Sequence, residues 1–379
     1  MNKKEISEIR RLFTPDRCPF TRICGCYVDG EKNKKMEMKE AFLSLPEEDM
    51  FKYFDLFKKT LSGSLGKNLM HLSFPLAQEA EGGAQEFLYR LKNSGLKEDA
   101  LLEAFYDKVI ESYREPENYF IILVHGAYDI PRRAKDGLEM FDASDDVYEF
   151  LLCSICPVKL SKPGLSYKDD TNAISERIRD RVVEPPTSGF LFPAFTDRNT
   201  DLHSLLYYSK NPDELKQEFS QQLFGCDPPL TAASQKETFN TLVADTLLEG
   251  CTYETVKAIH ESLSQLIEER KDDPEPLTLM REDVKNLLES TGAQAQALEQ
   301  FDEEFQAAAK DSQAPLFVSN VINTRKFEIK TPDINISVKP ERADLIETRI
   351  LDGRPYFLIP ADDEVEVNGI PVKPLHAPE

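Results

Sequence analysis

The spacing of apolar residues changes twice along the chain. Before about residue 228, short apolar runs such as Phe120-Ile121-Ile122-Leu123-Val124 are interspersed with stripes at helical spacing. Between residues 230 and 310 the apolar residues recur only at helical spacing, and after residue 313 a strand-like alternation returns. A period near 3.6 residues predicts helices, and a period of about two predicts strands. We therefore predict a mixed α+β fold.

In the first region, the pattern predicts a mixed sheet with helices packed on it. Proline and acidic residues after Leu45 mark a helix start, and Asp29-Gly30 marks a hairpin turn. Pro157 lies inside a predicted strand and requires an edge position or a bend there. For residues 202–209 a helix remains an alternative to a strand. The predicted helices are residues 3–13, 45–61, 84–92, 97–114 and 211–224, and the predicted strands are residues 21–28, 35–42, 69–74, 119–124, 148–160, 190–192 and 202–209.

The rest of the chain divides into a helical and a strand-rich region. Four helices are predicted, and then Asp352-Gly353 and Asn368-Gly369 mark hairpin turns of an antiparallel meander. This late sheet either stands alone or completes the first one. We expect three regions, namely a mixed α/β domain at 1–228, an acidic helical segment at 229–311 and a β-rich region at 312–379. The four predicted helices are residues 234–248, 253–270, 281–290 and 295–309.

The acidic charge is concentrated in one part of the chain. The sequence contains 46 bases and 68 acids, which gives a formal charge of −22. Residues 235–311 contain 18 acids and 7 bases, a balance of −11, whereas residues 119–210 contain 14 acids and 11 bases, a balance of −3. An acidic surface repels nucleic acid and other polyanions. An anion-binding surface is therefore expected in residues 119–210.

Cysteine usage and hydropathy indicate a cytoplasmic protein with reduced thiols. The chain has seven cysteines, an odd number, and its first dozen residues are too charged to form the apolar core of a signal peptide. The longest apolar runs are strand-sized, whereas a membrane span needs about 20 apolar residues. We therefore expect no membrane partner.

Two cysteine pairs are candidate metal ligands. Cys24 and Cys26 lie in a predicted strand and project from one face, and Cys153 and Cys156 have the two-residue spacing of zinc ribbons. Four thiolates could hold one zinc ion. However, Cys153 and Cys156 also lie in a predicted strand, where residues three apart point to opposite faces. Buried structural thiols are therefore the preferred interpretation, and no cofactor is predicted, with zinc as the alternative.

A polar site is a second hypothesis, at the end of the strongest predicted strand. His125 follows the run 120–124, and Asp129 comes four residues later. A histidine at a strand end can act as a general base, with a carboxylate that orients it. A loop histidine without a partner is the preferred interpretation, because the chain lacks G-x-S-x-G, H-E-x-x-H and G-x-G-x-x-G motifs. Residues 63–67 also lack the spacing of a phosphate-binding loop.

Basic residues cluster in the nearly neutral middle region. Together with Tyr167, Tyr207 and Tyr208 they could line a groove for an anionic partner. The preferred interpretation is pairing with neighbouring acids such as Glu176, Asp180 and Glu184, which contributes little free energy. The candidate anion-binding residues are Arg132, Arg133, Lys159, Lys162, Arg177, Arg179 and Arg181.

Several stretches of the chain resemble a known family. They are residues 22–28 (RICGCYV), 59–67 (KTLSGSLGK), 152–160 (LCSICPVKL) and 189–195 (GFLFPAF). The chain resembles, over nearly its whole length, bacterial proteins grouped as a domain of unknown function. This resemblance implies no activity, ligand or catalytic residue. The order of mixed α/β part, helices and late strands is also similar to that of larger bacterial nucleoid-associated proteins.

Three functions follow from these observations. The first is a non-catalytic interaction or regulatory protein with a protein partner, since no catalytic signature is present and the acidic helices can present a face. The second is a nucleic-acid-linked protein that uses the basic clusters, although the net charge opposes it. The third is a cysteine-ligated metal protein or enzyme. Whether the protein is an enzyme stays open.

Overall fold

The chain has the predicted mixed α+β structure and folds into two compact units. The structure is a computed structural model and describes residues 1–133, 139–140, 146–213, 217–227, 230–309, 315–361 and 365–372. The first unit comprises Met1–Ser234 and Asp273–Pro276, and the second comprises Gln235–Asp272 and Leu277–Glu379. The expected boundaries of three regions, at 1–228, 229–311 and 312–379, stay a prediction.

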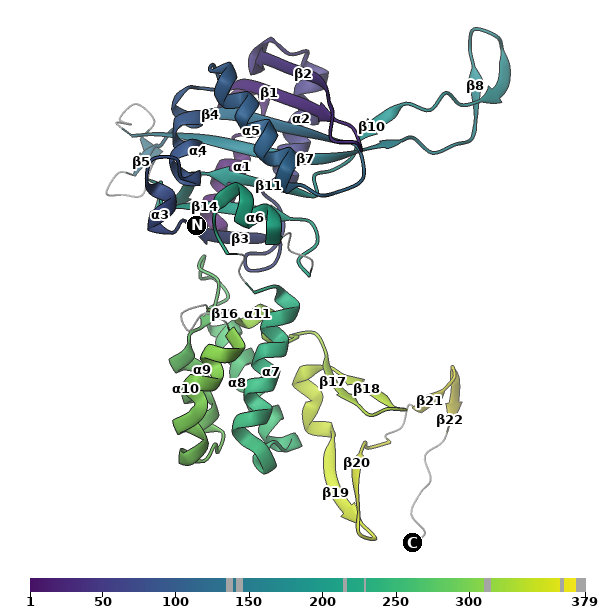
Figure 1. Cartoon of the computed structure of the whole chain (residues 1–379). Helices are drawn as coiled ribbons and strands as arrows, with labels where there is room; N and C mark the ends of the chain where they lie inside the picture. The colour runs from purple at the N-terminus through teal and green to yellow at the C-terminus, as the bar shows by residue number, and fades with distance from the viewer. Residues whose placement is uncertain are drawn as a thin grey trace. The chain divides into compact units, whose positions relative to one another are not determined.

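The first unit is built around an eight-stranded antiparallel sheet (Figure 1). The hairpin predicted at Asp29-Gly30 joins the first two strands of the chain, and the strand alternative is confirmed for residues 202–209. In spatial order the strands are β2 (Lys34–Ala41), β1 (Phe20–Val28), β4 (Tyr119–Asp129), β7 (Val147–Leu160), β11 (Ser188–Phe192), β14 (Ser204–Ser209) and β3 (Leu69–Ser73), with β10 (Arg181–Val183) also paired to β7.

Helices cover both faces of this sheet. Side chains of β4 and β7 are buried on both sides, because apolar helix faces pack against each. On one face lie α4 (Ala84–Asn93), α5 (Asp99–Ser112) and α6 (Gln217–Phe224), and on the other lie α1 (Lys3–Arg11) and α2 (Glu47–Thr60). The shorter elements are α3 (Leu76–Glu79), the 3₁₀ turns η1 (Pro15–Arg17) and η2 (Phe42–Ser44), and the strand pairs β5 (Arg132–Arg133) with β6 (Glu139–Met140), β8 (Leu165–Lys168) with β9 (Ala173–Glu176) and β12 (Ala194–Thr196) with β13 (Asn199–Asp201).

Pro157 marks the point where the sheet splits. Pairing of β11 with β7 ends at Ser188↔Ile155, and pairing of β10 with β7 begins at Val183↔Val158. The Pro157 carbonyl accepts a hydrogen bond from the Glu184 amide at 2.8 Å, so the nitrogen without a hydrogen faces the gap between β10 and β11. The predicted break is therefore one-sided, because β7 continues to pair with β4 through Tyr119↔Pro157.

In the second unit, the four predicted helices are confirmed. They are α7 (Ala232–Leu247), α8 (Tyr253–Glu269), α9 (Arg281–Ser290) and α10 (Ala295–Ala309), joined by η4 (Leu248–Gly250), α11 (Val318–Val321) and the pair β15 (Thr278–Leu279) with β16 (Leu316–Phe317). The buried Gln235 holds these elements together. Its Oε1 accepts hydrogen bonds from the Phe317 amide at 2.9 Å and from Asn320 Nδ2 at 3.0 Å.

The late strands form separate hairpins rather than one meander. Among the described residues, the hairpins are β17 (Phe327–Lys330) with β18 (Asn335–Val338), β19 (Glu347–Leu351) with β20 (Arg354–Leu358) and β21 (Val365–Val367) with β22 (Ile370–Val372). The turns predicted at Asp352-Gly353 and Asn368-Gly369 are confirmed, with positive φ at all four residues. The 3₁₀ turn η5 (Pro340–Leu345) separates β18 from β19. In the described chain these strands do not complete the first sheet.

We expect the substitution Gly189→Ala to destabilise the first unit. A Cβ at Gly189 would lie 2.4 Å from the Cys153 carbonyl oxygen and 2.6 Å from Thr60 Cγ2. Because the nearer atom belongs to the backbone of the neighbouring strand, the clash cannot be relieved by a rotamer change. Overpacking of this kind costs roughly 1–3 kcal/mol of unfolding free energy. Thermal unfolding measures the loss, with Gly250→Ala, which meets no atom within 4 Å, as the control. Equal midpoints for the two variants would contradict the packing described.

Candidate functional site

A β-ribbon arm extends from the sheet of the first unit (Figure 1). The end of β7 pairs with β10 from Val158↔Val183 to Leu160↔Arg181, and β8 pairs with β9 from Leu165↔Glu176 onwards. Four residues lie between Leu160 and Leu165 and four between Glu176 and Arg181, so both pairings belong to one ribbon. The Ser161 amide donates to the Asp180 carbonyl at 2.8 Å and bridges the two parts. We call residues 159–183 the arm.

The tip of the arm exposes an apolar face. Tyr167 pairs with Ile174 and Leu165 pairs with Glu176, so these four side chains project from the same side of the ribbon. Leu165 is 75% exposed, Tyr167 57% and Ile174 70%. A two-stranded hairpin is marginally stable by itself, and clustered exposed apolar side chains mark interaction sites. The tip is therefore a candidate docking surface.

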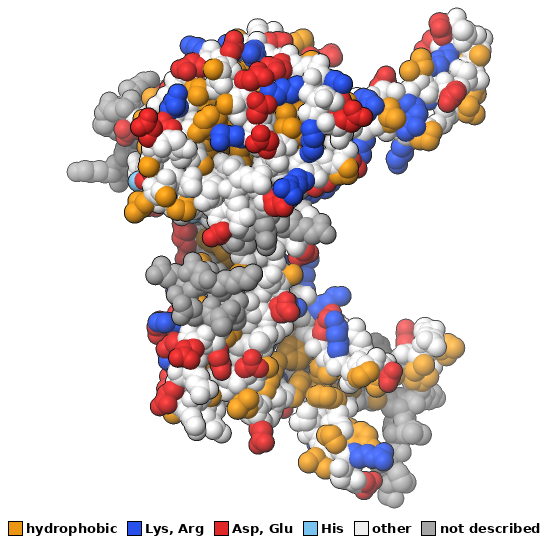
Figure 2. Space-filling model, in the orientation of Figure 1, with side chains coloured by type: hydrophobic (Ala, Val, Ile, Leu, Met, Phe, Trp, Pro, Cys, Tyr) orange, Lys and Arg blue, Asp and Glu red, His pale blue; other side chains and the backbone are white. Residues whose placement is uncertain are grey.

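The arm also brings together most of the predicted anion-binding residues. Lys159, Lys162, Arg177, Arg179 and Arg181 all lie on it and are exposed, and Figure 2 shows basic and hydrophobic side chains together there. In residues 159–183 there are six bases and four acids, a balance of +2 on a chain of charge −22. Arg132 and Arg133 form β5, but their side chains lie outside the described residues.

The expected pairing of the three arginines with neighbouring acids is not observed within the described residues. Arg179 Nε donates to the Ser161 carbonyl at 2.7 Å, and the ion pair formed by the arm is Lys159 with Glu117 at 3.1 Å. Of the three predicted tyrosines, only Tyr167 lies on the arm. Tyr207 and Tyr208 are 2% exposed, because β14 lies inside the sheet and is covered on both faces.

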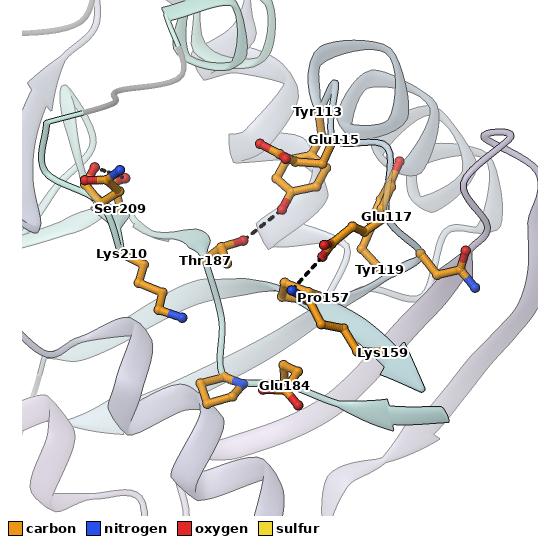
Figure 3. A pocket seen from close by; sticks show the side chains of 13 residues that line it. Tyr113, Glu115, Glu117, Tyr119, Pro157, Lys159, Glu184, Thr187, Ser209 and Lys210 are labelled. Atoms are coloured by element: carbon orange, nitrogen blue, oxygen red, sulfur yellow. Dashed lines mark hydrogen bonds and ion pairs between the residues drawn. The ribbon is translucent and has the colours of Figure 1, made fainter. Parts of the chain in front are cut away.

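A pocket of about 540 Å³ lies at the root of the arm, where β10 and β11 separate (Figure 3). Sequence reasoning missed it, because its walls come from segments far apart along the chain. The segment between α5 and β4 forms one wall, the chain between β10 and β11 a second, and the end of β14 a third. The lining residues are Tyr113, Glu115, Glu117, Asn118, Tyr119, Pro157, Lys159, Glu184, Pro185, Thr187, Ser209, Lys210 and Asn211.

Paired polar groups hold the walls of this pocket. Tyr113 Oη and Thr187 Oγ1 are 2.8 Å apart, and burial raises the pKa of the Tyr113 phenol above its ordinary value, so it stays protonated. Lys159 bonds Glu117, and Figure 3 shows the Lys210 side chain pointing toward the centre of the pocket. The lining contains charges of both signs but neither cysteine nor histidine. It suits hydrogen bonding to a polar group.

The four candidate cysteine ligands are not brought together. Cys24 and Cys153 both face Leu123 of β4 and are thus two strands apart, about 10 Å. Cys26 lies on the same face as these two, and Cys156 lies on the other face of the sheet, because β7 alternates. A tetrahedral zinc site needs all four sulfurs at about 2.3 Å from the metal. Within the part of the chain that the structure describes, no cluster of metal-ligating side chains is present.

The preferred interpretation of His125 as a loop histidine without a partner is wrong, because His125 lies inside β4 and contacts the neighbouring strand. Its Nδ1 lies 2.7 Å from Thr21 Oγ1 of the adjacent strand. Asp129 is four residues further along β4, about 13 Å away at a rise of 3.3 Å per residue, and it is exposed. Asp129 therefore does not orient the imidazole. Burial lowers the pKa of His125, which keeps the ring neutral near pH 7.

Among the described residues, no helix has both the length and the apolar composition needed to cross a bilayer. The family model described as "Domain of unknown function (DUF4317)" matches residues 1–370, and the chain belongs to this family. No curated protein matches the chain.

The burial of the cysteines predicts how they react. Desolvation raises the pKa of Cys26 to about 12 and also raises the pKa of Cys24, Cys153 and Cys156, which lowers the reactive thiolate fraction near neutral pH. We expect dithionitrobenzoate to modify the exposed Cys251 rapidly and these four only on unfolding. Cys251→Ser should remove the rapid phase. Rapid labelling of any of these four buried cysteines, or their protection by added zinc, would contradict their separate, buried positions in the sheet.

Proposed function

For this member of the DUF4317 family, we propose a non-catalytic interaction role. In this role the arm docks on the acidic surface of a second copy of the chain. The observation that carries the proposal is the apolar face of the arm tip. Leu165, Tyr167 and Ile174 are each more than half exposed and share one side of the ribbon. Covering such side chains stabilises a complex by about 25 cal/mol per Å² of apolar surface.

Charge complementarity supports a second copy as the partner. The arm has a balance of +2, whereas residues 235–311 have a balance of −11. Two chains of charge −22 repel each other as whole molecules, so they associate only where opposite local charges meet. The basic arm of one copy and the acidic helical segment of the other carry such opposite local charges.

The nucleic-acid alternative is favoured by a different feature of the arm. Arg177, Arg179 and Arg181 are exposed and make no ion pair with the described residues, so they are available to phosphates. β-Ribbons that insert apolar side chains into nucleic acid are known. The net charge of −22 opposes this alternative and also opposes self-association, but duplex nucleic acid presents one negative charge per about 1.7 Å of its length and is therefore the less favourable partner.

We expect purified protein to dimerise in a salt-sensitive manner at micromolar concentration. The triple variant Leu165→Ser, Tyr167→Ser and Ile174→Ser should raise the dimer dissociation constant at least about tenfold, because these side chains form the apolar contact. All three are exposed in the single chain, so the fold should be retained. Sedimentation equilibrium at two salt concentrations measures the effect. The control is Leu76→Ser, which removes an apolar side chain of similar exposure (84%) on α3.

The outcomes separate the two proposals. A wild-type chain that stays monomeric, or a triple serine variant that dimerises normally, rules out docking through the tip. If the monomer instead binds duplex DNA, with an affinity that falls steeply with salt and is lost in Arg177→Gln, Arg179→Gln and Arg181→Gln, the nucleic-acid alternative replaces it.

A further inference from the structure

The second unit contains a pocket of about 460 Å³ between α7, α8 and β17. Helical spacing builds two of its walls. Residues 236, 239, 240 and 243 recur at the i, i+3, i+4, i+7 positions of α7, and residues 256, 259 and 260 recur at the i, i+3, i+4 positions of α8. The chain between α11 and β17 forms the third wall. All lining residues belong to one unit and are described.

The floor of this pocket is apolar. Phe239 and Val243 of α7, Ile259 of α8, Val321 of α11 and Phe327 of β17 are each less than 8% exposed and line it. The His260 ring packs edge-on against Phe327, with ring centroids 5.2 Å apart. An apolar floor with a few convergent polar groups is typical of small-molecule sites.

Three exposed lysines and one glutamate line the rim of the pocket. Lys330 Nζ lies 2.8 Å from Glu328 Oε2, and Lys326 and Lys236 are near enough that all three lower the pKa of the Glu328 carboxyl group. The rim therefore has a local balance of +2 beside the most acidic part of the chain, residues 235–311. Figure 2 shows basic side chains gathered over the segment that enters β17, with hydrophobic ones beside them.

We propose that this pocket binds an amphiphilic carboxylate, with the apolar body on the floor and the carboxylate among Lys236, Lys326 and Lys330. Glu328 shows that a carboxylate fits beside Lys330, and Lys236 and Lys326 line the same pocket. Lysines act as point charges that attract carboxylate and phosphate alike, so the net charge of the ligand has to discriminate between them. The surrounding acidic surface disfavours polyanions, which selects a ligand of single negative charge. The volume lies within the range of pockets that hold small organic ligands.

The test is titration calorimetry of the full chain with decanoate, with decanol and with acetate. We expect decanoate to bind, decanol to bind at least about fivefold more weakly because it lacks the charge, and acetate to give no measurable heat. Each of Lys236→Gln and Lys326→Gln should weaken decanoate binding about threefold, and the double variant about tenfold. Val256→Glu, at a lining position that is 39% exposed, should weaken it at least as much by placing an acid at the rim.

The matched control is Lys271→Gln. Lys271 follows the far end of α8, is exposed, does not line the pocket and pairs with Glu268 at 3.0 Å. Its variant should bind decanoate like the wild type. Absence of decanoate binding at millimolar concentration, equal binding of decanol, or equal losses in the Lys271 and Lys236 variants would each overturn the proposal. None of these outcomes depends on the arm, because its residues are unchanged.

Discussion

The pairing of β4 with β7, from Asp129↔Val147 to Tyr119↔Pro157, is the contact on which the rest of the first unit depends. Both strands bury side chains on both faces, so neither is stable unless helices cover each side. α4, α5 and α6 meet this requirement on one face, and α1 and α2 on the other. The same requirement explains why the cysteines of β1 and β7 are buried between the sheet and the helices. They fill the two apolar layers, where thiols behave as small hydrophobic groups.

The split at Pro157 gives β7 two different neighbours along its length. On one side of the split β11 completes the core, and on the other β10 begins the arm. The pocket at the root of the arm occupies the space between β10 and β11. The pocket and the arm therefore both originate at Pro157, which lacks an amide hydrogen. The lysine pocket of the second unit has an independent origin, since two helix faces and a strand meet there.

Local signals in the sequence were sufficient to predict most helices and strands. Contacts between residues on different strands could not be predicted from them. The helix at α2 follows from the proline and acidic residues at its start, and the hairpins at Asp352 and Asn368 follow from turns that act over a few residues. The partner of His125 depends on the register of β1 against β4, which no local pattern encodes. A hairpin in the arm did have a signal, since Asp169-Asp170-Thr171-Asn172 is a turn sequence between two short alternating runs. Lys236 and Lys326 are too far apart in sequence for any motif to connect them.

The continuity of β7 from the core into the arm also has a mechanical consequence. The same strand that lies between β4 and β11 continues to Leu160, at the base of the ribbon. A force that pulls Leu160 along the axis of β7 is therefore transmitted directly into the sheet. The hydrogen bonds to its neighbours lie perpendicular to that axis and bear such a force together, in shear, whereas peeling would break them in succession. Tension applied by a bound partner is thus spread over the whole sheet.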